Sequence, residues 1–205
     1  MNTPAAQFSP RPLLILVSGP AGSGKTTLCE RMTAAFPDRI RRVITCTTRA
    51  PRGAERHGID YHFFSAKEFE TKIAAGEFLE HAVVHQNHYG TRKADVYQHL
   101  ENGFDLLLNL DVQGAGIVRS VAEQDDFLRR ALVSIFLMPP SREELLRRLQ
   151  GRGTDHPDEV ARRLRVAEEE MARWQDYDYC LISGPRDADF EKIKAVYLAE
   201  KMRVG

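Results

Sequence analysis

The chain has 205 residues, of which 42% are hydrophobic and 28% charged, and its 29 Lys and Arg residues balance its 29 Asp and Glu residues. This length suits one well-buried core with an insertion or two rather than two independent domains. The formal net charge of zero gives no indication of a nucleic-acid or membrane surface. The three cysteines show no metal-type spacing, so we expect reduced thiols in a cytoplasmic protein.

The first predicted strand leads into a phosphate-binding motif. Residues 13–18, almost all apolar, predict a buried parallel strand, and a helix is expected over about residues 25–35. The pattern G-x-x-x-x-G-K-[ST] between them is satisfied by Gly19, Pro20, Ala21, Gly22, Ser23, Gly24, Lys25 and Thr26, with Thr27 next.

Each residue type in this P-loop has a physical purpose. Its glycines allow a tight turn that points successive N–H groups at one anion, and the helix N-terminus adds a positive dipole. We expect Lys25 to reach the β- and γ-phosphates of a nucleoside triphosphate, and the Thr26 hydroxyl to ligate Mg²⁺. The alternative is a Gly-rich turn with a chance Lys-Thr pair, and the flanking strand and helix argue against it.

The rest of the chain alternates predicted strands and helices. Further strands are expected at residues 41–46, 59–64, 78–85, 106–111, 131–138 and 179–182. A short helix is expected from the capping box of Ser65 and Glu68 to Gly76, and longer ones at 93–102, 141–149, 157–174 and 189–202. Residues 87–92 are expected to form a turn. One apolar stripe on the 157–174 helix comprises Val160, Leu164, Ala167, Met171 and Trp174.

This alternation predicts an α/β fold with a P-loop NTPase-type core around a mostly parallel sheet. Residues 45–95 have mixed strand content, and residues 139–175 form a charged helical hairpin, so we interpret the first as an inserted lobe and the second as a lid. The core of this single domain, 1–205, then comprises about residues 12–44, 96–138 and 176–205.

Ordered motifs beyond the P-loop resemble those of the guanylate kinase family. They are Thr45 with Thr47-Thr48-Arg49-Ala50-Pro51-Arg52, Glu55, Gly58-Ile59-Asp60-Tyr61-His62-Phe63, Phe78-Leu79-Glu80-His81-Ala82, Tyr89-Gly90-Thr91, Asp111-Val112-Gln113-Gly114, and Gly151-Arg152-Gly153-Thr154 with Arg163. The resemblance runs from about residue 13 to 179. It implies a Mg²⁺-dependent enzyme that transfers the γ-phosphoryl group of ATP to GMP, giving ADP and GDP, with a GMP-binding lobe and a lid over ATP.

The resemblance assigns the acceptor phosphate to Arg49, Arg52, Tyr61 and Tyr89, with Glu55 also in the GMP-binding set. Two guanidiniums and two phenol hydroxyls suit a phosphate dianion, because forked donors match phosphate oxygens. Taken without the other motifs, the arginines could form a solvated basic loop and the tyrosines could be packing residues.

Four further residues match the family positions that read the base, namely Thr45, Glu80, Thr91 and Asp111. The Glu80 carboxylate only accepts hydrogen bonds, so it suits the N1–H and exocyclic amine of guanine and opposes the bare N1 of adenine. A lone glutamate would more often be a surface residue. Asp111 follows a buried strand and could also hold Mg²⁺-bound water, and the sequence leaves these two roles open.

The resemblance assigns catalytic roles to Lys25, Arg49 and the lid arginines, which are Arg148, Arg152 and Arg163. Their charge would neutralise the oxygens among which charge shifts during phosphoryl transfer. For the neighbouring Arg147, Arg162 and Arg165 we expect a solvated helix face.

Three sites, comprising four residues, depart from the family pattern. Asn109 stands where the family commonly has Asp, Ser183-Gly184 where it has Asn-Asp, and Ala21 where it has Ser. The first could weaken the placement of Mg²⁺ or the base, and the second puts the contacts to adenine in doubt. No phosphate ligand is lost, so we expect activity.

Two other functions remain as alternatives. One is a kinase of a phosphorylated sugar, against which the guanine-reading set argues, and the other is a non-catalytic binding module, against which the intact P-loop argues. The expected partners are GMP and ATP, with no nucleic acid and no membrane. The sequence leaves open whether the protein is a homo-oligomer.

Overall fold

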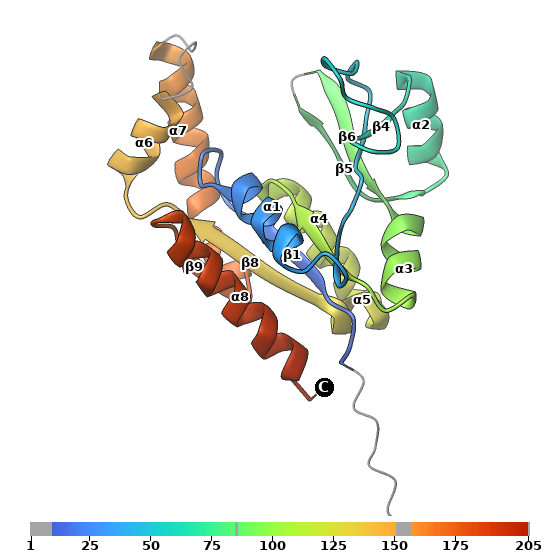
Figure 1. Cartoon of the computed structure of the whole chain (residues 1–205). Helices are drawn as coiled ribbons and strands as arrows, with labels where there is room; N and C mark the ends of the chain where they lie inside the picture. Colours follow the sequence, from blue (N-terminus) through green and yellow to red (C-terminus); the bar gives the residue numbers. More distant parts are fainter. Residues whose placement is uncertain (1–9, 85, 151–156, 205) are drawn as a thin grey trace, which may run out of the picture.

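A five-stranded parallel sheet lies at the centre of the molecule (Figure 1). The structure is a computed structural model that describes residues 10–84, 86–150 and 157–204. The strand order is β2-β7-β1-β8-β9, and every neighbouring pair is parallel. The strands are β1 Leu14–Ser18, β2 Ile40–Arg42, β7 Asp105–Asn109, β8 Leu132–Met138 and β9 Tyr179–Ile182.

Helices cover both faces of this sheet. The helices are α1 Lys25–Ala35 and α8 Arg186–Met202 on one face, and α3 Lys93–Glu101, α4 Val112–Glu123 and α5 Asp126–Ala131 on the other. Successive residues of β1 point to opposite faces, so Ile15 packs with the α1 and α8 cluster and Leu16 with the cluster of α3 and α4. A strand buried on both faces reads as a continuous apolar run, which confirms the predicted α/β fold and its parallel core.

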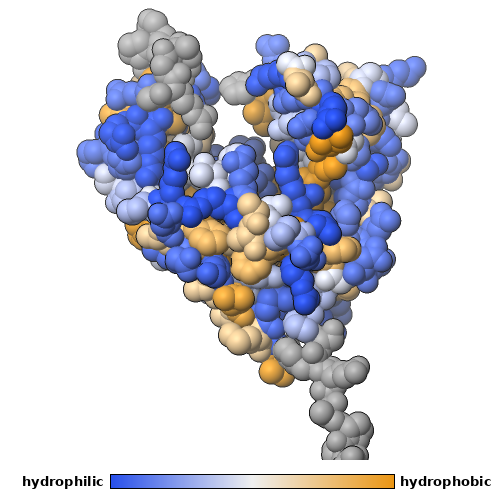
Figure 2. All heavy atoms as spheres, in the orientation of Figure 1, coloured by the Kyte–Doolittle hydropathy of each residue, from blue (hydrophilic) through white to orange (hydrophobic). Residues whose placement is uncertain are grey.

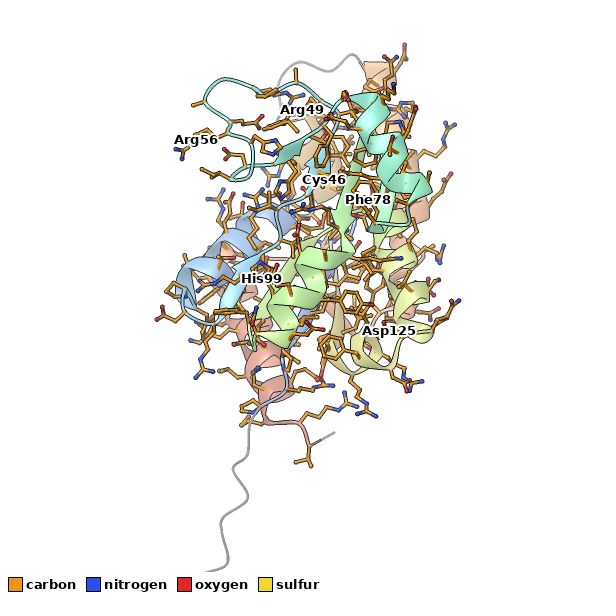
Figure 3. All side chains as sticks on the ribbon, turned by 90° about the vertical axis from the view of Figure 1, so that its right-hand side faces the viewer. Cys46, Arg49, Arg56, Phe78, His99 and Asp125 are labelled. Carbon is orange, nitrogen blue, oxygen red and sulfur yellow. The ribbon has the colours of Figure 1, made fainter. Side chains whose placement is uncertain are left out.

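A second, four-stranded sheet has the order β4-β3-β6-β5. It comprises β3 Cys46–Thr47, β4 His62–Phe63, β5 Phe78–Val84 and β6 Asn87–Arg92, with helix α2 Ala66–Ala74 packed on it. Its own small core contains Cys46, Phe69 and Phe78, and the two phenylalanine rings stack with centroids 4.4 Å apart. Cys46 and Phe78 are labelled in Figure 3, where they lie within this part of the molecule.

Helices α6 Arg142–Gln150 and α7 Pro157–Met171 form a pair that extends from the same side of the central sheet as the second sheet does (Figure 1). The second sheet with α2 is the first projection of the molecule, and this helix pair is the second. Leu145 and Leu149 pack against Leu164 and Ala167 between the two helices. The predicted bend at Gly151, Arg152 and Gly153 lies outside the described residues. Within the described part of the chain, no helix is both long and apolar enough to cross a membrane.

The expected turn at residues 87–92 is wrong, because these residues form β6. This strand pairs antiparallel with β5, and the hairpin connection places Gln86 at a left-handed φ of 67°. The run is rich in polar residues, which hid its strand character. Gly90 leaves no room for a side chain, because a Cβ there would lie 3.0 Å from the backbone oxygen of Glu80 and 3.1 Å from the Phe69 ring.

Other boundaries differ from the prediction. The extended stretch 41–46 divides into β2 and β3, which belong to different sheets, and only residues 62–63 of the stretch 59–64 form a strand. Trp174 lies in a short 3-10 helix, Trp174–Asp176, and is 43% exposed, so it does not belong to the apolar stripe of α7. Helix α8 begins three residues before the predicted start, at Arg186.

Helices α4 and α5 were not predicted. Asp111 caps α4, accepting a hydrogen bond from the Gly114 N–H at 2.7 Å, and Asp125 caps α5, accepting from Phe127 and Leu128. An aspartate before a helix is a recognised N-cap signal, so both starts were visible in the sequence. The start of α1 and the capping box of Ser65 with Glu68 are as expected.

The three cysteines are free thiols, as expected. Burial raises the pKa of the Cys29 thiol and of the Cys46 thiol to about 12, so both stay protonated at neutral pH. They therefore act as packing residues rather than as nucleophiles.

Candidate active site

The P-loop connects β1 to α1 at the carboxyl end of the central sheet. Gly19, Gly22 and Gly24 have φ values of 140°, 87° and 103°, which favour glycine. Gly19 is also sterically required, because a Cβ would lie 2.5 Å from the backbone oxygen of Leu137. Helix α1 starts without a side-chain cap, so the N–H groups of its first turn are left for an anion. The loop therefore suits a phosphate.

Lys25 and Thr26 occupy the start of α1. The Lys25 ammonium donates to the backbone oxygens of Gly19 at 2.7 Å and Pro20 at 3.0 Å, which keeps it beside the loop. The Thr26 hydroxyl oxygen accepts a hydrogen bond of 3.2 Å from the side-chain amide of Asn109, at the end of β7. Asn109, which stands where the family commonly has Asp, thus contacts the predicted magnesium ligand Thr26.

A cavity of about 220 Å³, here called the Glu80 pocket, lies between the second sheet and the start of α4. Its lining includes Thr45, Tyr61, Glu80, Tyr89, Asp111 and Gly114. Glu80 is only 4% exposed, and the fully buried Thr91 hydroxyl donates to its carboxylate at 2.7 Å. Burial raises the pKa of the Glu80 carboxyl to about 7, the nearby Asp111 carboxylate acts in the same direction, and the Thr91 hydrogen bonds oppose it.

Gly114 shapes this pocket, although sequence reasoning gave it no role of its own. A Cβ at this position would lie 3.2 Å from one Glu80 carboxylate oxygen and 3.5 Å from a carboxylate oxygen of Asp111. Its backbone N–H also holds the Asp111 side chain. A larger residue here would therefore press on the Glu80 carboxylate where the two acidic side chains approach α4. The only sequence signal was its place in the motif Asp111-Val112-Gln113-Gly114.

A loop between β3 and β4 carries the predicted phosphate-binding arginines, and Figure 3 labels Arg49 on it. The Arg49 guanidinium donates to the Glu55 carboxylate at 3.0 Å and lies 5.4 Å from the centroid of the Tyr61 ring. The other Glu55 oxygen accepts from the backbone N–H of Arg52 at 2.8 Å. These hydrogen bonds lower the pKa of the Glu55 carboxyl. Glu55 thus organises the loop as an anion.

The two predicted tyrosines face the same region. The Tyr61 and Tyr89 rings contact each other edge to face, with centroids 6.4 Å apart, and both residues line the Glu80 pocket. Hydrogen bonding to Glu55 and to Tyr89 raises the pKa of Arg49 above its usual value, so the Arg49 guanidinium stays positively charged. The arginine loop, the tyrosine pair and the buried glutamate therefore adjoin one another.

The predicted lid arginines differ in their contacts. Arg148, on α6, donates to the Glu144 carboxylate at 2.7 Å, to the Ser183 hydroxyl at 2.9 Å and to the P-loop oxygen of Ser23 at 3.3 Å. Arg163 lies on α7, whereas Arg152 lies outside the described residues. Arg147 and Arg162 pair with glutamates three residues earlier on exposed helix faces, as expected for solvated residues.

Glu170, on α7, was not selected from the sequence. Burial raises the pKa of its carboxyl, and the Lys25 ammonium and the Ala21 backbone N–H have the opposite effect. The second projection thus places an acidic side chain beside the P-loop. In the sequence it is the last of three consecutive glutamates, and no signal distinguishes it from a solvated charge.

A second cavity, of about 450 Å³, lies between the P-loop, α6 and the start of α8. We call it the arginine pocket, after Arg31, Arg147, Arg148 and Arg186 in its lining. Gly22 lies close to α6, because a Cβ on it would be in van der Waals contact with the Leu149 side chain, at 3.5 Å. Figure 2 shows the hollow between the two projections, with hydrophilic residues along much of its walls.

The chemistry of the donor set fits a metal ion carried by a nucleotide. Among the described residues, no group of three or more His, Cys, Asp or Glu side chains could hold a metal ion. Mg²⁺ bound through phosphates needs only one or two protein ligands, and the Thr26 hydroxyl lies at the P-loop for this purpose.

The chain has close relatives among known proteins. The family model described as guanylate kinase matches residues 10–200. A guanylate kinase from Cereibacter sphaeroides is 42% identical over 193 residues, which cover 94% of this chain and 89% of that protein. One from Clostridioides difficile is 39% identical over 198 residues, covering 97% and 93%. The crystal structure of guanylate kinase from Anaplasma phagocytophilum matches with a TM-score of 0.72 at 30% identity, covering 95% of this chain and 89% of that one.

Proposed function

The chain belongs to the guanylate kinase family and is an ATP:GMP phosphotransferase, and we propose that GMP binds in the Glu80 pocket while ATP binds in the arginine pocket. The second sheet with α2 would be the GMP-binding lobe, and α6 with α7 the lid. The reaction transfers the γ-phosphoryl group of ATP to GMP and yields ADP and GDP.

The observation that carries this proposal is the buried Glu80–Thr91 pair. A carboxylate that is almost inaccessible needs a donor, and guanine offers N1–H and an exocyclic amine at one edge. Adenine would present an unprotonated N1 to it, leaving two buried acceptors facing each other. Sites of this kind reject the wrong ligand strongly, because a buried polar group without a partner is costly. Thr45 and Asp111 line the same pocket and would complete the base site.

We assign the GMP phosphate to Arg49, Arg52, Tyr61 and Tyr89. The Arg49 guanidinium, held by Glu55 and close to both tyrosines, is preorganised for a dianion. Glu55 is itself an anion and would repel the phosphate, so its role is to position the loop rather than to contact GMP. This refines the sequence-based assignment of Glu55 to the GMP-binding set.

The ATP phosphates would lie in the P-loop, residues 19–27, against Lys25. The Thr26 hydroxyl, with Asp111 through water, would hold the Mg²⁺ that accompanies ATP, and that ion would supply charge neutralisation at the phosphates. Lys25, Arg148 and Arg163, together with Arg152, would neutralise the oxygens around the transferred group. The GMP phosphate is already anionic at neutral pH, so the transfer needs positioning and charge neutralisation rather than a general base.

The test is transfer from Mg·ATP to a panel of GMP, AMP, CMP, UMP and ribose phosphates, with ADP and the phosphorylated acceptor both measured. We expect turnover with GMP and none of comparable size with the other acceptors. Turnover with a sugar phosphate alone would contradict the base-site assignments. GMP binding without turnover would support a non-catalytic module instead.

We propose that the enzyme acts in the cytoplasm, where ATP and GMP are available and free thiols stay reduced. A test is cell fractionation of the source organism followed by detection with an antibody. Recovery with a membrane or secreted fraction would contradict the proposal.

A further inference from the structure

The second sheet has two faces, and the residues of the candidate site lie on one of them. Tyr61 lines the Glu80 pocket, and the Thr91 hydroxyl binds the Glu80 carboxylate there. Side chains alternate along a strand, so the residue after each of them points to the opposite face. These residues are His62, which follows Tyr61 and begins β4, and Arg92, which ends β6. Two residues of the site therefore each have a chain neighbour on the rear face of the sheet.

The two rear residues contact each other. The Arg92 guanidinium lies 3.1 Å from Nε2 of His62, and it donates two hydrogen bonds of 2.8 Å to the Asp95 carboxylate. A guanidinium has donors only, so His62 Nε2 is the acceptor and the neutral imidazole carries its proton on Nδ1. Burial lowers the pKa of His62, Arg92 acts in the same direction and Asp95 opposes them, which agrees with a neutral ring. We call these three side chains the Arg92 network.

This network connects the second sheet to the core. Asp95 lies in the first turn of α3, and Val96 and Leu100 of the same helix belong to the core cluster on the central sheet. The side chains of His62, Asp95 and Arg92 are 15%, 19% and 30% exposed, so water competes only in part for their hydrogen bonds. The network thus links β4, the end of β6 and α3 in a largely buried place.

Strands β4 and β6 do not pair with each other, because β3 lies between them. Both β3 and β4 are only two residues long, so their backbone pairing is short. The contact between His62 and Arg92 reaches across β3 and adds a side-chain link between the outer two strands. It therefore holds together the two segments that carry Tyr61 and Thr91.

We propose that His62 is a positioning residue for GMP. Its Nε2 atom holds Arg92, and this contact fixes the spacing between Tyr61 and Thr91. The inference rests on the proposed function, because it takes Tyr61 as a ligand of the GMP phosphate and Thr91 as part of the base site. One nucleotide occupies both places only if their spacing matches the distance from its phosphate to its base. Loosening the network therefore weakens GMP binding and leaves the P-loop, which belongs to the central sheet, unaffected.

The test compares two variants by steady-state kinetics with Mg·ATP and GMP. His62→Leu removes the acceptor and keeps an apolar side chain, whereas His62→Gln places an amide oxygen about where Nε2 lies. We expect His62→Leu to raise KM for GMP by about tenfold, with KM for ATP and kcat within about twofold of the wild type. His62→Gln should keep KM for GMP within about threefold. A residue needed only for packing would be replaced better by Leu, so equal KM values or the opposite order would overturn the inference.

A double-mutant cycle gives a second readout. Arg92→Met keeps the apolar stem without the donors and should by itself raise KM for GMP by about tenfold. If His62 acts through Arg92, adding His62→Leu to this variant should change KM for GMP no further. A further rise of about tenfold would show that His62 acts without Arg92 and would contradict the proposal. An unchanged KM in Arg92→Met would overturn it even where His62→Leu does not fold.

His99→Leu is the matched control. His99 lies on α3, and its ring contacts Phe104 rather than the network. Its KM values for GMP and ATP should both stay within about twofold of the wild type. A wild-type protein without GMP turnover would contradict the proposed function, whereas turnover with an unchanged KM for GMP in His62→Leu would overturn this inference alone. The two failures are therefore distinguishable.

Discussion

The Glu80 pocket and the arginine pocket differ in what their charges do. In the first, a single carboxylate is 4% exposed and its one side-chain hydrogen bond comes from a buried threonine. In the second, the Glu144 carboxylate pairs with Arg147 and Arg148, and the Arg147 side chain is 73% exposed. A buried group with unmet hydrogen-bonding capacity selects its ligand, whereas solvated and mutually paired groups mainly supply charge.

The comparison shows a buried carboxylate at one pocket and partly exposed, paired charges at the other. Burial raises the pKa of the Glu80 carboxyl toward neutrality, and a charged carboxylate in this place lowers the stability of the fold. The donor side avoids such a cost and keeps a positively charged surface for phosphates.

The largest effect is expected at Arg148. Arg148→Ala should lower kcat by about a thousandfold, because an arginine that neutralises a transferring phosphoryl group contributes on this scale. Arg162→Ala is the matched control, because the Arg162 guanidinium pairs with Glu159 on an exposed face of α7 and lies outside the lining of the arginine pocket. Its kcat should stay within about twofold of the wild type. Steady-state kinetics with saturating ATP and GMP gives both values, and equal losses would contradict the distinction.

Glu80→Gln should lower kcat/KM for GMP by about a hundredfold, because the amide opposes guanine donors with donors of its own. Since the folded pKa is raised, the wild-type carboxyl stabilises the fold less as the pH rises from its ordinary value to about 7. The variant should therefore have a higher Tm than the wild type at about pH 8, which excludes unfolding as the cause of lost activity.

Glu77→Gln is the control for this variant. Glu77 lies just before β5, and its exposed carboxylate pairs with Lys72 on the surface. Both kcat/KM and Tm should remain close to wild type, because exposed ion pairs contribute little. A loss in this variant equal to that of Glu80→Gln would remove Glu80 from the base site.

The third prediction concerns pH. GMP needs the charged Glu80 carboxylate, so its binding should be strong above about pH 7 and weaken as the carboxyl is protonated below it. We expect kcat/KM for GMP to fall by about tenfold between about pH 8 and pH 6. The Glu80→Gln variant lacks this carboxyl, so the pH dependence of its kcat/KM gives the contribution of the GMP phosphate and other groups. Identical pH profiles for the two proteins would contradict the assignment.

The smallest effect is expected at Asn109. Asn109→Asp would place a carboxylate 3.2 Å from the Thr26 hydroxyl in place of the amide. Added negative charge beside the magnesium ligand should lower the Mg²⁺ concentration for half-maximal activity by about two- to fivefold. Titration of activity with Mg²⁺ at fixed ATP measures this shift, and an unchanged or higher requirement would show that Asn109 lies outside the metal's influence.

The sequence predicted those parts of the fold whose conformation depends on the residues of the segment itself. The P-loop glycines, the Ser65–Glu68 capping box and the apolar residues of β1 each report their own conformation. Strand β6 was mistaken for a turn because its pairing with β5, rather than its own composition, makes it a strand. Residues 41–46 appeared as one extended piece because the sequence does not show that two sheets share them.

The site residues also fall into two groups, those that a sequence motif indicates and those that only the structure indicates. Glu80, Thr91 and Arg49 were identified through motifs, and the structure brings them close to Tyr61 and Tyr89. Glu170 and Gly114 were not given roles, because their importance comes from what lies opposite them in space. A glutamate among glutamates and a glycine inside a helix carry no distinguishing local pattern. Arg152 lies outside the described residues, so its role remains a prediction.

The most direct test of the central claim is the binding of GMP and AMP to the wild-type protein by titration calorimetry at about pH 8, without ATP. The two ligands share the ribose phosphate and differ only at the base, so the ratio of their Kd values isolates the Glu80 pocket. We predict that GMP binds at least about a hundredfold more tightly than AMP. Equal affinities would show that the buried carboxylate does not read the base, and would contradict the account.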